Sequence, residues 1–365
     1  MPRTEVSRMK KLLPRLVVSL LIAAGFVWVL KRGGLPLMPD EASFRGMSWS
    51  VIPVYAALWI AASFLRTYRW LYLLRPIAPN LSRWRVFGMG LIGFSAVFLA
   101  PLRSGEVVRP YLIANDGDVD FFQATGTVGA ERVVDGLVLT LVTFFALWLA
   151  PPLSPLPDKL GDLPLPVSAL PAAVYSALVF FACAFAAMAL FYWARDLARR
   201  LTLAVVGVVS RPLAEFLTRK VERIAEGLSF LPSRANLFSF LRETGLYWAL
   251  AIAAQWLLLR ASGLQAGLAE ACVTFGVMGI GSLVPSGPGF FGAYQIAGFS
   301  ALALYFTLSE VRDAGAAFLF VSYVTQFVLN TLPAVLGVWL MNKFPRLAPE
   351  PGAATSSPPP SPRAA

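Results

Sequence analysis

The segment Val86–Ile113 reads VFGMGLIGFSAVFLAPLRSGEVVRPYLI, an apolar stretch long enough to enter a membrane but broken part-way along. A membrane-spanning helix needs about 20 mostly apolar residues. Backbone that breaks at membrane depth must be shielded by protein or line a wet cavity. The segment is therefore predicted to form a re-entrant hairpin, and the alternative is an ordinary kinked span. The interrupting residues are Pro101, Arg103, Gly105, Glu106 and Arg109.

Composition identifies the whole chain as a polytopic membrane protein. Of its 365 residues, 57% are hydrophobic and only 14% are charged, and the mean hydropathy is +0.67. By length alone the chain could form two or three soluble domains. A soluble protein of this size could not bury so much apolar surface. The expected fold is therefore an all-α integral membrane protein with a single transmembrane domain at 12–344.

Several classes of function are excluded by the residues that the chain contains. It has no His, which removes His-based catalysis and His metal sites. Its two cysteines, Cys183 and Cys272, lie in apolar runs and are too few for a cysteine-based metal site. The net charge of +11 lies mostly in loops, which favours anionic headgroups over nucleic acid as its partner. No metal, cofactor or nucleic acid is therefore expected.

Six apolar runs are predicted to be full spans. They are Leu12–Leu30, Trp49–Leu65, Gly126–Ala150, Ala169–Trp193, Gly245–Leu264 and Ala316–Met341. The first run could instead be a signal peptide, but it leads into Lys31 without a small-residue cleavage site. The loop at 66–85 carries five arginines and no acid, and 195–242 is also basic, so both are predicted to be cytoplasmic.

The positive-inside rule, by which basic segments beside spans lie in the cytoplasm, predicts that both termini are cytoplasmic. Residues 1–11 are expected to form a basic N-terminal segment. Residues at about 195–242 are predicted to form an amphipathic connector at the inner interface. Residues 345–365 are rich in Pro, Ala and Ser and are predicted to be a disordered tail.

A second apolar stretch, Leu268–Leu308, is also broken by proline and glycine. Each stretch follows a helix that ends in similar letters, WLYLLR at 70–75 and WLLLR at 256–260, and each has a Gly four residues after a Pro. The charge pattern puts the entries of the two hairpins on opposite sides of the membrane, as in an inverted repeat. Paired broken segments of this kind point to a transport site near the midplane. The hairpin tips are predicted at Pro101, Pro285, Pro288 and Gly289.

The candidate substrate site consists of ionisable residues inside membrane segments, because each is costly there and needs a partner or water. Arginine offers a planar fork of donors that suits the phosphate of a lipid headgroup. Glu106 would hold one arginine in place or meet a lipid amine. The alternative is that these side chains extend to the interface and bind nothing specific. The candidate substrate-binding residues are Arg103, Gly105, Glu106, Arg109, Glu131, Arg132 and Asp135.

Two of these residues, Glu131 and Asp135, share one helix face. At the N-terminus of a span the helix dipole would favour them, which is a purely structural role. Deeper burial would instead make them partners for Arg103 or Arg109, or proton carriers.

Other polar residues near the site receive weaker assignments. Arg66 and Arg69 are expected to mark the inner interface, because they end an apolar run. Gln295 and Gln326 are possible pathway residues, and the alternative is that they hydrogen-bond between helices.

Three strings of the sequence together resemble a known family. They are PLRSGEVVR at 101–109, ERVVD at 131–135 and PSGPGFFG at 285–292. In this order and spacing they resemble the flippase-like transmembrane domain of lysylphosphatidylglycerol synthases, over roughly Leu12 to Met341. The resemblance implies lipid translocation across a bacterial inner membrane. The short Pro-rich tail stands where fused members carry an aminoacyl-transferase domain, so lysine transfer to lipid is not expected.

Two positions depart from the pattern of that family. Val97 stands where the family often has Asn, and Gln295 stands where it often has Glu. The second change removes a charge, so the substrate or its coupling can differ. Neither the lipid nor the oligomeric state follows from the resemblance.

Three functions are open at this point. The favoured one is a flippase for a phospholipid or another anionic or polyprenyl lipid, because of the paired broken segments. The second is a polyprenyl-phosphate-dependent glycosyltransferase with an acid of the Asp40-Glu41 pair as its catalytic group. The third is a scaffold that binds a lipid-synthesising enzyme through the basic region at 195–242.

Overall fold

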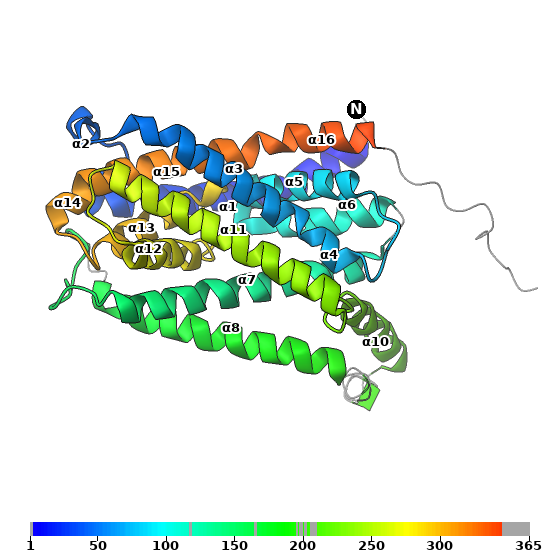
Figure 1. Cartoon of the computed structure of the whole chain (residues 1–365). Coiled ribbons are helices and arrows are strands. Elements are labelled where there is room, and N and C mark those ends of the chain that lie inside the picture. Colours follow the sequence, from blue (N-terminus) through cyan, green and yellow to red (C-terminus); the bar gives the residue numbers. More distant parts are fainter. Residues whose placement is uncertain are drawn as a thin grey trace, which may run out of the picture.

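The chain folds into an all-helical bundle, which we analysed in a computed structural model. The structure describes residues 3–116, 119–163, 166–194, 196, 200, 203–204 and 210–344. Helices make up 78% of the fold, and the described residues contain no strand. The long helices run roughly along one axis of the molecule (Figure 1). They are α1 (Arg3–Arg32), α3 (Ile52–Tyr68), α5 (Arg83–Leu99), α7 (Phe121–Leu149), α8 (Leu170–Trp193), α10 (Arg211–Glu226), α11 (Arg234–Ala261), α12 (Leu268–Gly281), α15 (Ala314–Thr331) and α16 (Pro333–Lys343).

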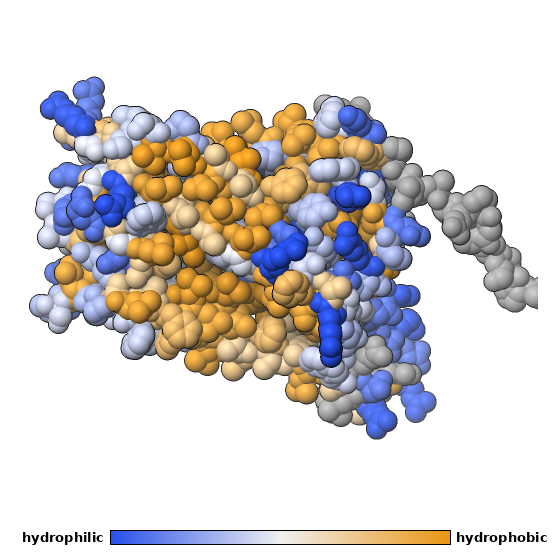
Figure 2. Space-filling view, viewed as in Figure 1, coloured by the Kyte–Doolittle hydropathy of each residue, from blue (hydrophilic) through white to orange (hydrophobic). Residues whose placement is uncertain are grey.

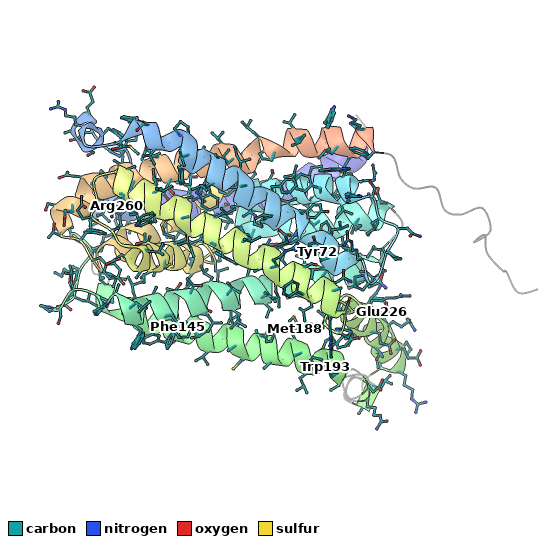
Figure 3. The ribbon with its side chains drawn as sticks, in the orientation of Figure 1. Tyr72, Phe145, Met188, Trp193, Glu226 and Arg260 are labelled. Carbon is teal, nitrogen blue, oxygen red and sulfur yellow. The ribbon has the colours of Figure 1, made fainter. Side chains whose placement is uncertain are left out.

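The exposed surface confirms a polytopic membrane protein. Four helical stretches are long and apolar enough to cross a bilayer: Trp49–Leu74, Phe121–Leu149, Val167–Trp193 and Leu308–Lys343. On the face shown in Figure 2, apolar side chains form a band across the middle, and polar ones gather at both ends. Arg260 and Glu226 lie at these opposite ends (Figure 3). A belt of this kind is stable only against hydrocarbon, because apolar surface exposed to water costs free energy.

The four stretches contain four of the six predicted spans. The span predicted at Ala316–Met341 is two helices, α15 and α16, which meet at Leu332 directly before a proline. The other two predicted spans, Leu12–Leu30 and Gly245–Leu264, lie within α1 and α11, which have 30 and 28 residues. The number of spans itself stays a prediction.

The helices do not begin where the apolar runs begin. Helix α7 begins at Phe121 rather than Gly126, because Asp120 caps it by accepting a hydrogen bond from the Phe122 N–H. Helix α11 takes in residues 234–242, which overlap the connector predicted at about 195–242. Helix α1 starts at Arg3, inside the segment predicted as a basic terminus. The predicted tail at 345–365 lies outside the described residues.

The first interrupted stretch folds back on itself. Helix α5 ends where Ala100 adopts an extended conformation, η2 (Pro101–Val107) packs back along α5, and α6 (Val108–Asp116) follows. Gly105 makes this close approach possible, because a Cβ there would overlap the carbonyl group of Ala96. At the mouth of the hairpin, Arg85 pairs with both carboxylate oxygens of Asp116.

The second interrupted stretch makes a similar hairpin. Helix α12 ends at Gly281, a turn leads through η4 (Pro288–Phe290), and α13 (Ala293–Leu302) packs back against α12. Gly289 has φ +71° and Gly292 has φ +91°, a region that favours glycine because it has no Cβ.

The two hairpins lie at opposite ends of the molecule, with α5 and α6 toward one end and α12 and α13 toward the other (Figure 1). Helix α1 contacts the tips of both, η2 and η4, and the Ser19 hydroxyl donates to the carbonyl of Ser286 at 3.1 Å. The arrangement agrees with two hairpins that converge in the interior.

Replacing Gly105 with alanine tests the packing of the first hairpin. Gly105→Ala should destabilise the protein by about 1–3 kcal/mol, because the added methyl group meets backbone that cannot rotate away. The measurement is thermal unfolding in detergent. Gly245→Ala is the matched control, since a methyl group added there has open space around it and helix propensity alone predicts an unchanged or slightly higher stability. Equal stability of both variants would contradict the packing argument.

Candidate functional site

A cavity of about 630 Å³ opens between the two hairpins and the helices around them. Its walls come from α3, α5, η2, α7, α11, α12 and α15, with one residue each from α6, α8, η4 and α13. Most of the lining is aromatic or aliphatic, and the charged residues in it are Arg66, Arg103, Glu106, Arg132 and Asp135. The described residues hold no group of three His, Cys, Asp or Glu side chains placed to bind a metal ion.

The innermost part of the site is an ion network that is almost completely buried. Arg69 lies at the bend between α3 and α4 (Trp70–Leu74), and its side chain is fully buried. Its Nη2 donates to Glu131 Oε1 at 3.2 Å and to Asp135 Oδ2 at 2.6 Å. Its Nη1 donates to the Thr244 hydroxyl of α11 at 2.8 Å. One guanidinium therefore joins three helices.

Arg69 was expected at the inner interface, and that prediction is wrong. The Asp and Glu that hold it lie deep in α7, with Asp135 the fifteenth of its 29 residues. They are therefore too far from the helix start for the dipole to explain them. An arginine at the end of an apolar run normally reaches water, and no pattern in the sequence shows that a bend turns this one inward.

Arg109 belongs to the same buried network. Its Nη1 donates to Glu131 Oε2 at 2.7 Å, and the side chain is fully buried. The guanidinium lies 4.4 Å from the ring centroid of Phe94 and 5.2 Å from that of Trp70. Arg109 does not line the cavity. It supports the wall of the cavity rather than facing a ligand.

A second set of ion pairs faces the cavity. Glu106 accepts from Arg103 Nη2 and from Arg132 Nε, both at 3.2 Å. Arg132 also lies 3.8 Å from Asp135, which connects this set to the buried one. These side chains keep about a quarter of their area exposed: 22% for Arg103, 28% for Glu106 and 31% for Arg132. They are the charged groups that a ligand in the cavity would meet first.

Arg103 also links the two hairpins. Its Nη1 donates to the carbonyl oxygen of Ser282, at the end of α12, at 2.7 Å. Its guanidinium lies 5.1 Å from the ring centroid of Phe290 in η4. Arg103 and Phe290 have φ +57° and +58°, and they are the two non-glycine residues with positive φ among the described residues. Such backbone persists only where the surroundings hold it, and here the two strained residues hold each other.

Polar residues of the second hairpin and of the neighbouring α15 divide into two groups. Gln326 lines the cavity and donates to the Tyr294 hydroxyl at 2.9 Å, and Tyr294 lies 2.6 Å from the Ser322 hydroxyl. Gln295 does not line the cavity; its Oε1 accepts from the Gly292 N–H at 2.7 Å and caps α13. The structure thus shows a capping role for Gln295, and its place in a pathway stays a prediction.

The predicted tip residues and Gly105 shape the hairpins. Pro101 begins η2, Pro288 begins η4, and Gly289 supplies a turn with positive φ. Pro285 is exposed in the turn between α12 and η4. Pro285, Pro288, Gly289 and Gly105 are not part of the cavity lining.

Sequence reasoning missed other lining residues. Arg66 lines the cavity, donates to Asn330 Oδ1 at 3.0 Å and lies 4.2 Å from the ring centroid of Phe94. Like Arg69, it was expected at the inner interface, and its place in the cavity wall corrects that. The only signal in the sequence was the spacing of Arg66 and Arg69, which are three residues apart and so share a face if the segment is helical.

The acidic pair of the first loop has a structural role. Asp40 caps α2 (Glu41–Arg45) by accepting from the backbone N–H and the hydroxyl of Ser43, at 3.0 and 2.8 Å. These hydrogen bonds hold the pKa of Asp40 below its usual value. A carboxylate so stabilised is a poor proton acceptor, which weakens the glycosyltransferase alternative.

A comparison with protein families agrees with this architecture. The family described as lysylphosphatidylglycerol synthase TM region matches residues 16–334 of the chain. The chain belongs to this family. Membership of the lysylphosphatidylglycerol synthase TM region family identifies a membrane protein of lipid metabolism or transport. Neither a curated protein nor a solved structure was found to match the chain.

The buried and the cavity-facing parts of the network should differ in their effect on stability. Arg69→Gln leaves two buried carboxylates short of a partner, so we expect a loss of about 3–5 kcal/mol in thermal or denaturant unfolding. Arg103→Gln breaks a part-exposed pair and the bond to the Ser282 carbonyl, and should cost about 1–2 kcal/mol. If Arg103→Gln destabilised the protein as much as Arg69→Gln, the division of the network would be wrong.

Proposed function

We propose that the chain is a lipid flippase of a bacterial inner membrane, which moves a phospholipid or another anionic or polyprenyl lipid between leaflets. The observation that carries this proposal is the cavity between the two hairpins, in which an arginine of the first hairpin bonds to the backbone of the second. The substrate would enter with its headgroup in this cavity and its acyl or prenyl chains toward the lipid.

The chemistry of the lining supports a phosphate ligand. Arg103 and Arg132 both reach the cavity, and each guanidinium has a fork of N–H donors that matches phosphate oxygens. The carboxylate between them, Glu106, holds the two forks in position before a ligand arrives. A site that is ordered in advance loses less entropy on binding.

The apolar part of the lining supports a lipid rather than a free phosphate compound. Phe94, Phe98, Phe275 and Phe290 line the cavity beside the charged groups. Aromatic walls of this kind can contact the glycerol and the first methylene groups of an amphiphile. A soluble anion would gain nothing from them.

The lengths of the hairpin helices support re-entrant segments. Helix α5 has 17 residues and α12 has 14, so at 1.5 Å per residue they extend about 25 and 21 Å. The hydrocarbon core of a bilayer is about 30 Å thick. Two short hairpins from opposite sides would bring their broken backbone together near the middle, where a flippase needs a shielded polar path.

The end of the molecule that carries α10 is assigned to the cytoplasm in this proposal. Basic residues gather in the segments that end there, and the positive-inside rule puts such segments in the cytoplasm. A lipid-synthesising enzyme is the partner that would supply a substrate at this side.

Leaflet exchange in vesicles tests the proposed function. The purified protein is reconstituted with a fluorescent phosphatidylglycerol, and a membrane-impermeant reductant reports how fast inner-leaflet lipid reaches the outer leaflet. Wild type should exceed protein-free vesicles, and Arg103→Gln or Arg132→Gln should slow exchange about tenfold or more, because each loses a charge-assisted contact to phosphate. Arg242→Gln is the control, since Arg242 pairs with Glu243 outside the cavity lining.

Two results would count against a flippase. One is exchange by the wild type that is no faster than in protein-free vesicles for phosphatidylglycerol and for a polyprenyl phosphate. The other is equal slowing by Arg242→Gln and the two cavity variants, which would mean that the effect does not come from the cavity.

A further inference from the structure

The charged cluster around the cavity carries more arginine than carboxylate. Arg66, Arg103 and Arg132 line the cavity, and Arg69 and Arg109 lie behind it. The carboxylates among them are those of Glu106, Glu131 and Asp135. Five arginines therefore face three carboxylates, and the cluster has two positive charges in excess. Charge inside a membrane protein is costly without a counter-charge.

Nearly every carboxylate oxygen of the cluster is already bound to arginine. The two oxygens of Glu106 accept from Arg103 and Arg132. The two oxygens of Glu131 accept from Arg69 and Arg109. Asp135 Oδ2 accepts from Arg69, and only its Oδ1 has no hydrogen-bond partner among the described residues.

The groups without partners in the cavity wall are mainly donors. Among the residues that line the cavity, four buried N–H groups have no acceptor, whereas Asp135 Oδ1 is the one buried side-chain acceptor without a donor within the described part of the chain. The four donor atoms are Arg66 Nε, Arg132 Nη2, Trp59 Nε1 and Trp248 Nε1. Trp59 and Trp248 are more than nine-tenths buried.

Such a lining discriminates between headgroups. A phosphate oxygen accepts from guanidinium and indole N–H groups, which would satisfy the free donors and compensate the excess charge. An ammonium group brings three donors and no acceptor. It would find one free carboxylate oxygen, Asp135 Oδ1, on a residue that already lies beside Arg69 and Arg132.

We propose that the cavity selects lipids whose headgroup is anionic and free of ammonium groups, and rejects aminoacylated and ethanolamine lipids. The selectivity rests on the proposed function, because it assumes that the headgroup enters this cavity. A headgroup of this kind is negatively charged, whereas the headgroup of a lysylated lipid is positively charged. The structural cause is that arginine occupies both oxygens of Glu106 and Glu131, which leaves Asp135 Oδ1 as the one carboxylate oxygen of the cluster without a partner among the described residues.

The test compares the binding of three short-chain lipids to the purified full chain in detergent. Binding is measured by the shift in unfolding temperature and by displacement of a fluorescent lipid. The probes are dihexanoyl forms of phosphatidylglycerol, phosphatidylethanolamine and lysylphosphatidylglycerol. Wild type should bind phosphatidylglycerol more tightly than the other two by on the order of tenfold or more, because like charges placed together are strongly unfavourable.

Arg103→Met sharpens the test, because it frees one oxygen of Glu106 and removes one positive charge. It should weaken phosphatidylglycerol binding and strengthen binding of the two ammonium lipids, which reverses or abolishes the preference. Arg132→Met frees the other oxygen of Glu106 and repeats the test if the first variant does not fold. Arg242→Met, outside the cavity lining, should leave the preference unchanged.

The outcomes separate the selectivity from the function. Equal binding of all three lipids by wild type would overturn the selectivity and leave the flippase proposal standing. Binding of none of them, nor of a polyprenyl phosphate, would overturn both. A preference for phosphatidylglycerol that persists in Arg103→Met and Arg132→Met would show that occupied carboxylates are not its cause.

Discussion

The guanidinium of Arg69 has no access to solvent, and the need to neutralise its charge organises the interior of the protein. Its partners come from α7 and α11, so α3, α7 and α11 must keep a fixed distance where they surround it. Glu131 also accepts a hydrogen bond from Arg109, so it fixes the position of this residue of the first hairpin. In a low-dielectric interior a pair of this kind is strongly destabilised when one partner is lost. The position of the first hairpin therefore depends on a charge that is buried on another helix.

The two hairpins are held together by contacts that also hold strained backbone. Arg103 and Phe290 each have a positive φ, which costs about 1–3 kcal/mol for a residue with a side chain. The hydrogen bond of Arg103 to the Ser282 carbonyl and its contact with the Phe290 ring offset part of this free-energy cost. Both contacts cross the cavity rim from one hairpin to the other. The residue that connects the hairpins is therefore also one of the charged groups that line the cavity.

Hydropathy and charge predicted the membrane class, four of the spans and the two breaks, because these depend on long runs of residue type. The pairing of Arg109 with Glu131 was also within reach, since buried charges must find opposite charges. The burial of Arg69 could not be predicted from the sequence. It depends on the bend before Trp70, which no local residue pattern marks. The capping role of Gln295 was out of reach for a similar reason: it depends on the turn at Gly292, whose positive φ appears only in the folded chain.

Phe94 explains how so much positive charge is tolerated at one place. The guanidinium groups of Arg66, Arg109 and Arg132 lie 4.2, 4.4 and 5.5 Å from its ring centroid. The negative face of an aromatic ring attracts a cation by about 0.5–2 kcal/mol, and more strongly where water is excluded. The ring therefore offsets part of the repulsion without using up a carboxylate or forming a hydrogen bond. It leaves the arginine N–H groups free in the cavity wall, and this is what a site for an anion requires.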